Sequence, residues 1–519
     1  MVGAALLLLV SAAGAAAQVP GLHATMDTLV VPRDDVPKEW TFIGYSFTRA
    51  TASNVSPEND VLQGQVIGRL FGSNSTDTQG GTATYVEQRF VPYLVYRPKI
   101  LDGLATFRTM FKIDYTWGDV AYGIGGNRGG AINAAQVNLQ TLMANVDIRP
   151  DDAAWNVVIG MQRLYDNAHD PHRITLQQAQ TSGYRLAFWG TNALGVNLFA
   201  SPRPGVYTRL GAYQLWENLV AEDDDVVLFM ADVDTRLTPR LEVGADAWYL
   251  RDRAEGAGGI SVLGQGLNSL LAGYNGATRL GITNRYHADI GWLGGRAAYN
   301  RDFLAGRWWA DAFVIANVGM IDTLAAGEYE KAADVLGVTA NASLSYKYGM
   351  TAQDRVWGEL IFTSGDGDGA RDGTVGSVLT GNIWGSPVGI YSSHRALLLF
   401  PDPQVVNRYY SAVHDVSNMG LGVTGLAANL SKDWIPNRFY TKVGAAAAIS
   451  NTTPAGGGDY VGTEVNFEAR YNLGVFLTLG LNAGYLALGD FYEAPGVAGQ
   501  PTQPDDPWVT FLTLSWLMF

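Results

Sequence analysis

The sequence predicts an all-β fold, a single transmembrane antiparallel β-barrel of about 18 strands, with 16 strands as the second choice. The first reason is composition: of 519 residues only 16% are charged, whereas 62 are Gly, 25 Tyr, 19 Phe and 14 Trp, as in strands joined by turns and flanked by aromatic residues. The second is that apolar and polar residues alternate over segments of ~10–13 residues, longer than strands of soluble sheets. The third is that beyond residue 17 no uncharged apolar run approaches the ~18–20 residues of a spanning helix, which excludes a polytopic helical protein.

The first 17 residues are expected to be a secretory signal peptide. Residues 4–17 read AALLLLVSAAGAAA, an apolar core followed by small residues, and Ala15 and Ala17 form an A-x-A cleavage site before Gln18. Residues 18–37 are then a short periplasmic leader, and residues 38–519 form the barrel. We therefore expect the mature chain in the outer membrane of a Gram-negative bacterium.

Nineteen segments read as strands, and because bacterial barrels favour even strand numbers, 18 strands are expected. In chain order the segments begin near Trp40, Val61, Tyr85, Ala105, Val137, Trp155, Tyr184, Val206, Val227, Leu241, Tyr286, Trp308, Val338, Val356, Leu421, Phe439, Thr463, Val475 and Trp508.

The alternation assigns one face of each strand to lipid. The odd positions of Val475–Ala487 read VLLLAYA, and in Thr463–Tyr471 a stripe reading VFAY opposes one reading ENER. Because lipid offers no hydrogen bonds, such a sheet must close on itself and leave no edge. Aromatic residues near segment ends are expected to form interfacial girdles: Tyr96, Tyr115, Trp117, Trp155, Trp248, Tyr249 and Trp357.

The opposite faces are expected to line a water-filled lumen, because wall side chains cannot fill a barrel of this size. The charged residues that phase assigns to the lumen are Glu87, Arg89, Arg108, Lys112, Asp114, Asp232, Asp234, Arg236, Glu242, Asp246, Asp311, Lys347, Arg355, Glu359, Lys442, Glu464, Glu468 and Arg470. Rings of like charge would set ion selectivity, but this set is mixed and holds no dominant basic ladder. The alternative is that opposite charges brace the wall by pairing across strands.

Two connections, Asp252–Asn284 and Ser364–Gln404, are too long for turns. Loops of this length in a compact protein are usually functional or disordered. We expect them to fold partly into the lumen and narrow it; the alternative is an exposed surface loop.

The second loop contains a candidate metal site; His169 and His172 could also ligate a metal, but they lie in a proline-containing loop with no third ligand. Asp366, Asp368 and Asp372 are spaced like part of a calcium loop, but Ser377 stands where an EF-hand would have its bidentate Glu. That excludes an EF-hand and leaves a loose divalent site as the alternative to no metal. No cofactor is expected.

Several classes of function are excluded by composition. The chain has no Cys, which removes disulfides, thiolate zinc sites and cysteine nucleophiles. With 49 Asp and Glu against 35 Lys and Arg, it lacks the basic surface that nucleic acid requires. His287 and Asp289 share a face with no serine partner, so we expect no enzyme.

The C-terminal segment Pro507–Phe519 reads PWVTFLTLSWLMF and ends on an aromatic residue. It resembles the terminal strand by which bacterial outer-membrane barrels are recognised for assembly. We therefore expect three partners: the barrel-assembly machinery through the strand ending at Phe519, outer-membrane lipid, and lipopolysaccharide.

Four short stretches resemble, in order, the alginate-export family of outer-membrane barrels. Tyr85–Tyr93 (YVEQRFVPY) is similar to that family's early EQR strand, and Phe107–Gly118 resembles the strand that follows. Val158–Arg163 (VIGMQR) is similar to its GRQ strand. Phe362–Asp368 (FTSGDGD), leading to Leu399–Pro401, resembles its SGD…FP strand and long loop.

The resemblance implies an 18-stranded, monomeric barrel that exports or admits a polar solute such as a polysaccharide. Met161 stands where the family pattern has Arg, and this departure affects the arginine set that would bind a polyanion. The sequence therefore predicts a passive outer-membrane channel, porin-like or exporter-like, for hydrophilic solutes. The alternative is a plugged structural or adhesive barrel that presents its loops outside.

Overall fold

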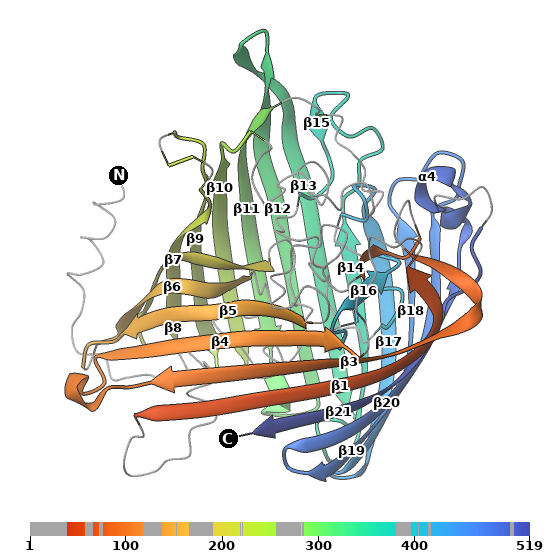
Figure 1. Cartoon of the computed structure of the whole chain (residues 1–519), viewed down its shortest axis with the longest axis horizontal. Coiled ribbons are helices and arrows are strands. Elements are labelled where there is room, and N and C mark those ends of the chain that lie inside the picture. The colour runs from red at the N-terminus through yellow and green to blue at the C-terminus, as the bar shows by residue number, and fades with distance from the viewer. Residues whose placement is uncertain are drawn as a thin grey trace.

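The fold is an antiparallel β-barrel of 18 strands (Figure 1). The computed structural model describes residues 39–57, 66–71, 76–117, 137–151, 153–165, 190–217, 219–220, 222–255, 282, 285–379, 396–402, 404–413, 417–498 and 503–518. The barrel strands are β1 (Trp40–Pro57), β3 (Thr76–Tyr96), β4 (Ala105–Thr116), β5 (Val137–Ile148), β6 (Trp155–Tyr165), β7 (Gly190–Arg203), β8 (Val206–Trp216), β9 (Val226–Thr238), β10 (Leu241–Asp252), β11 (Tyr286–Tyr299), β12 (Trp308–Ala325), β13 (Glu328–Lys347), β14 (Arg355–Thr363), β17 (Val423–Ile435), β18 (Phe439–Ser450), β19 (Tyr460–Gly474), β20 (Leu477–Leu488) and β21 (Trp508–Met518).

The barrel is closed by its first and last strands. Each barrel strand pairs antiparallel with the next one along the chain, and β1 pairs with both β3 and β21. Ser46 on β1, for example, faces Phe90 on one side and Trp516 on the other. This closure confirms the expected barrel and its 18 strands. Of the nineteen expected starts, Val61 and Tyr184 lie outside the described residues.

Short elements complete the described chain. β2 (Val66–Arg69) pairs in parallel with β16 (Arg408–Ser411), and β15 (Thr374–Val375) pairs in parallel with β13. The helical turns are η2 (Lys99–Leu101), η4 (Arg301–Phe303), η6 (Asp490–Glu493) and α4 (Pro495–Ala498). None of the helices in the described residues is long and apolar enough to cross a membrane.

The two ends of the barrel differ in the length of their connections. At one end β7–β8, β9–β10 and β19–β20 are joined by two residues each, and both β1 begins and β21 ends there. At the other end 18 residues separate β1 from β3 in sequence, and 59 separate β14 from β17. Bacterial outer-membrane barrels have short periplasmic turns and long extracellular loops. We therefore treat the short-turn end as the periplasmic end.

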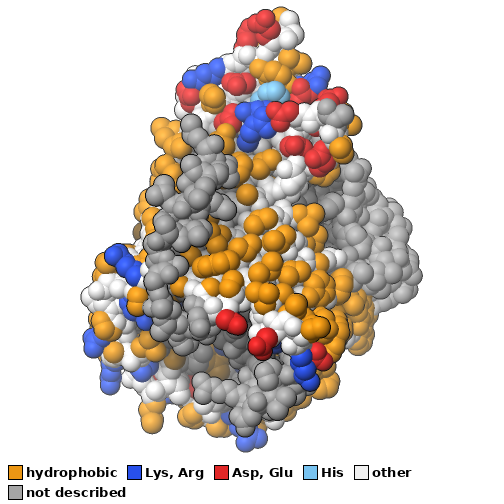
Figure 2. All heavy atoms as spheres, turned by 90° about the vertical axis from the view of Figure 1, so that its left-hand side faces the viewer, with side chains coloured by type: hydrophobic (Ala, Val, Ile, Leu, Met, Phe, Trp, Pro, Cys, Tyr) orange, Lys and Arg blue, Asp and Glu red, His pale blue; other side chains and the backbone are white. Residues whose placement is uncertain are grey.

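Apolar side chains of the strands point outward, as the alternation predicts. On β19 Val465 is 54% exposed and Phe467 37%, whereas Asn466 between them and Glu464 and Glu468 on either side are buried. Figure 2 shows hydrophobic side chains gathered across the middle of one outer face, with charged side chains above and below. A closed sheet with an apolar outer band is the form that satisfies every backbone group in lipid.

Tryptophans mark the periplasmic edge of this band. Trp40, Trp155, Trp308, Trp434 and Trp516 lie at the short-turn ends of their strands, or in the adjoining residues, and are 38–61% exposed. Tryptophan is enriched at this depth because its ring is amphipathic. Of these five, only Trp155 was predicted for a girdle; the predicted Trp117 and Tyr249 are 58% and 42% exposed near the other ends of their strands.

Two of the expected girdle residues are instead inside the barrel. Trp248 is 2% exposed and donates its indole N–H to Asp232 at 2.9 Å, and Trp357 is 6% exposed. The prediction was wrong at these positions because both faces of these strands carry large side chains. A position near the end of a segment therefore did not show whether the tryptophan faces lipid or the interior.

The extracellular edge of the band is visible in the register of β10–β12. The outward positions Tyr249, Gly291 and Val318 are cross-strand neighbours, whereas one step further out Arg251 faces Asp289. From Trp308 to Val318 is about ten residues, or roughly 25 Å for a strand tilted by ~40°. This matches the height of the apolar band of outer-membrane barrels.

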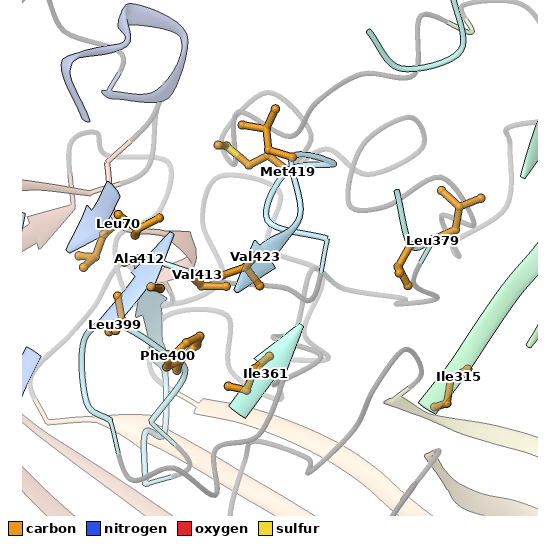
Figure 3. Packing of buried hydrophobic residues seen from close by; sticks show 14 of the residues in the cluster. Leu70, Ile315, Ile361, Leu379, Leu399, Phe400, Ala412, Val413, Met419 and Val423 are labelled. Carbon is orange, nitrogen blue, oxygen red and sulfur yellow. The ribbon is translucent and has the colours of Figure 1, made fainter. Parts of the chain in front are cut away.

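The extracellular half of the interior contains a hydrophobic core built from connections as well as strands. Figure 3 shows Leu399, Phe400, Ala412 and Val413 of the β14–β17 connection packed near Ile361 and Val423 of the wall. Leu398, Leu399, Phe400 and Val413 are 0% exposed. The expected inward fold of Ser364–Gln404 is therefore confirmed in part, for residues 377–379 and 396–402, which are buried. Of Asp252–Asn284, residues 256–281, 283 and 284 lie outside the described residues.

Candidate pore and constriction

The inward faces of β3–β5 carry charged side chains that bond to each other across strands. Arg89 on β3 makes two hydrogen bonds to Asp114 on β4, Nε to Oδ1 at 2.7 Å and Nη2 to Oδ2 at 2.6 Å, and both residues are 1% exposed. Arg108 on β4 donates to Asn145 on β5 at 3.0 Å and lies 3.4 Å from Asp147. Alternation places these groups on one face, and antiparallel pairing then brings opposite charges side by side.

A second group of pairs lines β8–β11. Arg209 Nε donates to Asp232 at 2.6 Å. Arg296 on β11 reaches Asp234 on β9 at 2.9 Å and also bonds to Asp246 on the intervening strand β10. One guanidinium therefore ties three consecutive strands together.

The other residues predicted for the lumen also face the interior. Four of the basic groups lie near an acidic or amide oxygen: Lys112 is 3.8 Å from Asp114, Arg236 is 3.0 Å from Glu242, Arg470 is 2.7 Å from Glu468, and Lys442 is 2.7 Å from Asn466. Glu359 accepts a hydrogen bond from Asn341 at 2.9 Å. Asp311 is 9% exposed. Lys347 Nζ lies 5.8 Å from the ring centroid of Phe303. Arg355 Cζ lies 4.5 Å from that of Trp357. Cations and anions alternate around the wall, the arrangement expected of bracing pairs; that these residues line a solute path stays a prediction.

A single stretch of the β14–β17 connection runs along the inner wall. We call residues 396–402 and 404–413 the inner segment. Its beginning is fixed by Glu464 on β19, whose carboxylate accepts the backbone N–H groups of Leu397, Leu398 and Leu399 at 2.7–2.8 Å. Glu464 is 0% exposed. Three N–H donors on one carboxylate hold both the charge and the chain in place.

Further along, the inner segment is bonded to β1 and β3. Arg49 Nη1 reaches Asp402 at 2.6 Å, and both side chains are at most 3% exposed. Glu87 on β3 accepts the N–H of Asn407 at 3.1 Å and lies 3.5 Å from Arg408. These partners are 320–353 residues apart in sequence.

The inner segment also folds on itself and packs tightly against the wall. Ala412 and Val413 donate their N–H groups to the carbonyls of Leu398 and Leu399 at 2.7 and 2.8 Å, which brings the end of the segment beside its beginning. The ring of Phe400 covers Gly425 on β17, where an added Cβ would lie only 2.6 Å from the ring. A side chain at that position would displace the phenyl ring, so glycine is required there for close packing.

The start of the same connection lies against β11 and β12. Trp292 donates its indole N–H to the carbonyl of Leu379 at 3.1 Å, and the N–H of Leu379 donates to Asn317 at 2.8 Å. Trp292 and Asn317 are at most 1% exposed. The connection is thus held on both sides of the interior.

The acidic loop considered for a metal uses its first carboxylate internally. Asp366 accepts the backbone N–H groups of Asp368, Gly369 and Gly376 at 2.7–3.0 Å. In the part of the chain that the structure describes, no three His, Asp or Glu side chains gather closely enough to hold a metal ion. The site at Asp366, Asp368 and Asp372 stays a prediction.

The interior charges that sequence reasoning missed include Arg49, Asp147, Arg209, Arg296, Asp402 and Arg408. Arg296 was hidden because the inward positions before it on β11 are Tyr, Ala, Ile, Trp and Gly, which leave no polar stripe to follow. Asp402 and Arg408 lie in a connection, where alternation gives no phase. Extending the phase of the Trp40 strand to Arg49 would have found that residue.

Comparison with known proteins yields matches only among solved structures. No family model and no curated protein matches the chain. Pseudomonas aeruginosa OccK5 (OpdH) is 9% identical over 92% of this chain and 98% of its own, with a TM-score of 0.46. The outer membrane protein OpdK of the same organism is 11% identical over 92% of this chain and 98% of its own, with a TM-score of 0.47. Acinetobacter baumannii OccAB4 is 9% identical over 93% of this chain and 100% of its own, also with a TM-score of 0.47. At these values the likenesses identify neither a family nor a solute, and the alginate-export resemblance stays a prediction.

Proposed function

We propose that this protein is a passive channel for hydrophilic solutes in the outer membrane of a Gram-negative bacterium. The observation that carries the proposal is the closed 18-stranded barrel with an apolar outer band and charged residues facing inward. Barrels of 16–18 strands enclose more space than their wall side chains can fill, and porins use that space as an aqueous path. The inner segment, bonded to β1, β3 and β19, would form the constriction of this path.

Weak charge selectivity is expected of the path. Inward-facing basic groups such as Arg89, Arg209 and Arg296 each have a carboxylate at hydrogen-bonding distance. Paired charges largely cancel at a distance, so a permeating ion meets no ring of one sign. A neutral or weakly charged polar solute, such as an oligosaccharide, fits this wall better than a strongly charged polymer.

Single-channel recording in planar bilayers tests the proposal. The purified protein should produce stepwise ion currents, and the reversal potential in a salt gradient should be small. Replacing Arg108 and Lys112 together by Glu should shift that potential towards cation selectivity. Lys99→Glu, the same reversal of charge in an exposed turn, is the control. Absence of current, or an equal shift in the control, would contradict the proposal.

A plugged structural or adhesive barrel is the second candidate, and the hydrophobic core inside the barrel favours it. Leu398, Leu399 and Phe400 are fully buried in the interior, which is more typical of a packed plug than of an open pore. A plugged barrel would give no stepwise current in the same recordings.

The remaining assignments belong to the same proposal. We infer that residues 1–17 are a cleaved signal peptide and that the barrel is monomeric, with membrane lipid and lipopolysaccharide around it. The strand that ends at Phe519 would be read by the barrel-assembly machinery. Membership of the alginate-export family, with polysaccharide as solute, is the finer form of the proposal.

A further inference from the structure

The number of residue pairs between neighbouring strands is not the same all around the barrel. Over their described residues β5 and β6 share only five residue pairs, from Ala144–Met161 to Ile148–Val157. On their other sides, β5 shares eleven pairs with β4 and β6 eleven with β7. Where both strands are described beyond these pairs, residues 140–143 of β5 and 162–165 of β6 are each paired with one neighbouring strand only. We call these two facing unpaired edges the β5–β6 split.

Two backbone irregularities stand where the pairing ends. The register of β4 against β5 shifts between Met110 and Phe111, which leaves Leu142 as a bulged residue on β5. Gly160 on β6 has φ +119°, and a Cβ there would lie 2.5 Å from the carbonyl oxygen of Ala144. Bulges and strand glycines bend a strand away from its partner, so these two features turn the strands apart.

At the same point a side-chain amide, instead of a backbone N–H group, donates a hydrogen bond to a strand carbonyl. Asn145 donates its amide to the carbonyl of Met161 at 2.9 Å. Gln162, the next residue, directs its amide to the carbonyls of Val158 and Gly195 at 3.1 and 3.2 Å and accepts from Asn197 at 2.7 Å. The end of the ladder is thus finished by side-chain hydrogen bonds instead of a frayed pair.

The split begins within the apolar outer band. Leu194 on β7, the cross-strand partner of Met161, is 56% exposed, and Val196 and Ile159 one step below it are 45% and 46% exposed. Outward apolar residues at this level meet hydrocarbon. Unpaired backbone groups are not tolerated against lipid unless water, protein or a solute reaches them.

The inside of the wall beside the split is apolar too. Leu142 and Met143 are 2% and 8% exposed and belong to a cluster that also holds Ile43, Tyr45, Phe47, Val91, Tyr93, Val95, Met110, Val406 and Leu517. Val406 belongs to the inner segment, so this cluster reaches from the split to the constriction. Apolar side chains are thus packed together from the inner side of the split to the inner segment.

We propose that the β5–β6 split is a lateral opening through which apolar or amphipathic solutes pass between the lumen and the outer leaflet. An apolar solute leaving along the barrel axis would have to enter water, whereas one leaving sideways passes from one apolar surface to another. This inference rests on the proposed channel because the solute reaches the split from the lumen. It adds apolar and amphipathic solutes to the hydrophilic ones, and a sideways exit to the exit along the barrel axis.

Crosslinking the split tests this opening, and the absence of native Cys gives a clean background. Met143→Cys with Gln162→Cys occupies the next register positions above the last pair. Val146→Cys with Ile159→Cys, inside the paired region, is the matched control. Oxidation of the first pair should lower uptake of the apolar dye N-phenyl-1-naphthylamine into intact Gram-negative cells at least ~5-fold, and reduction should restore it. Oxidation of the control pair should leave uptake unchanged.

A second variant covers the case in which the cysteines at the split lie too far apart to bond. Met143→Trp fills the inner side of the split and should lower dye uptake without any crosslink. Ion current of both variants in planar bilayers should stay that of the unmodified protein, because the axial path is untouched. Unchanged dye uptake in the oxidised split pair, once its crosslink is seen on a gel, and in Met143→Trp would overturn the lateral opening. Absence of ion current in every protein would instead overturn the proposed channel.

Discussion

Glu464 is the residue on which the position of the inner segment depends most. Its carboxylate accepts three consecutive backbone N–H groups and a fourth hydrogen bond from Asn466 at 2.8 Å, all out of contact with solvent. Hydrogen bonds to a charged acceptor contribute about 1.5–3 kcal/mol each, and a buried N–H left without an acceptor is costly. Removing this one group therefore releases one end of the inner segment.

Glu464→Ala should widen the constriction. The three N–H groups of Leu397–Leu399 would seek water, and the inner segment would leave the wall at this end. We expect single-channel conductance to rise and to become noisier, whereas Glu464→Gln, which keeps one acceptor oxygen, should lie between the variant and the native protein. Equal conductance in all three would contradict the role of Glu464.

Asp354 lies in the β13–β14 turn at the periplasmic end and should make stability depend on pH. Burial raises the pKa of its carboxyl, but the N–H groups of Asp433, Thr351 and Met350 and the Lys432 ammonium outweigh burial and lower that pKa below its usual value. A carboxyl with a lowered pKa stabilises the folded state above the pKa it has in the unfolded chain, and this contribution is lost as pH falls through the folded value.

Asp354→Asn should therefore destabilise the barrel at pH 7 by about 1.5–3 kcal/mol, the contribution of a hydrogen bond to a charged acceptor. The difference should shrink as pH falls below about 4, where the carboxyl of the unfolded chain becomes protonated, and should be lost as pH falls through the lower pKa of the folded state. Heat denaturation in detergent, followed by gel mobility at each pH, measures it. A difference that stays constant down to pH 2 would contradict the assignment.

At the scale of elements, alternation predicted the faces of the strands better than their lengths. The stripe reading VFAY in Thr463–Tyr471 does face outward, and Glu464 and Glu468 face inward. β13, however, begins at Glu328, ten residues before the expected Val338. Its early part carries Glu, Glu, Lys and Asp because it projects beyond the hydrocarbon, where no lipid demands apolar side chains, so the pattern that marks a strand is missing there.

The outward face of β20 provides a direct test of which side meets lipid. Leu481 is 41% exposed and lies near the middle of its strand, whereas Thr478 is on the inward face close to the periplasmic end. Leu481→Arg should destabilise the folded barrel by ~2–4 kcal/mol, the midplane cost of Arg on a lipid face. Thr478→Arg should change stability by much less, because water is within reach. Urea titration in lipid vesicles measures both; similar losses would contradict the assignment of faces.

At the scale of the whole molecule, closure of the barrel and the inward course of its longest connection were predictable, but the contacts that hold this connection were not. A chain with apolar stripes on many strands has to close in lipid, so strand count and outward faces follow from the sequence. The inner segment depends on contacts such as Arg49–Asp402, between residues 353 positions apart, and no local pattern encodes them. The same holds for the β5–β6 split, because the glycine at position 160 has no distinct sequence signal among 62 glycines.

The central claim is that polar side chains of the strands face a water path through the barrel while their apolar neighbours face lipid. Lys347 and Arg355 are half-buried inward residues of β13 and β14, and Tyr346 and Val356 beside them point outward. Each is replaced singly by Cys, and current is recorded while a charged, water-soluble thiol reagent is added. The account predicts a stepwise fall in current for the cysteines at 347 and 355 and none at 346 and 356. Equal block at all four positions, or block only at 346 and 356, would contradict it.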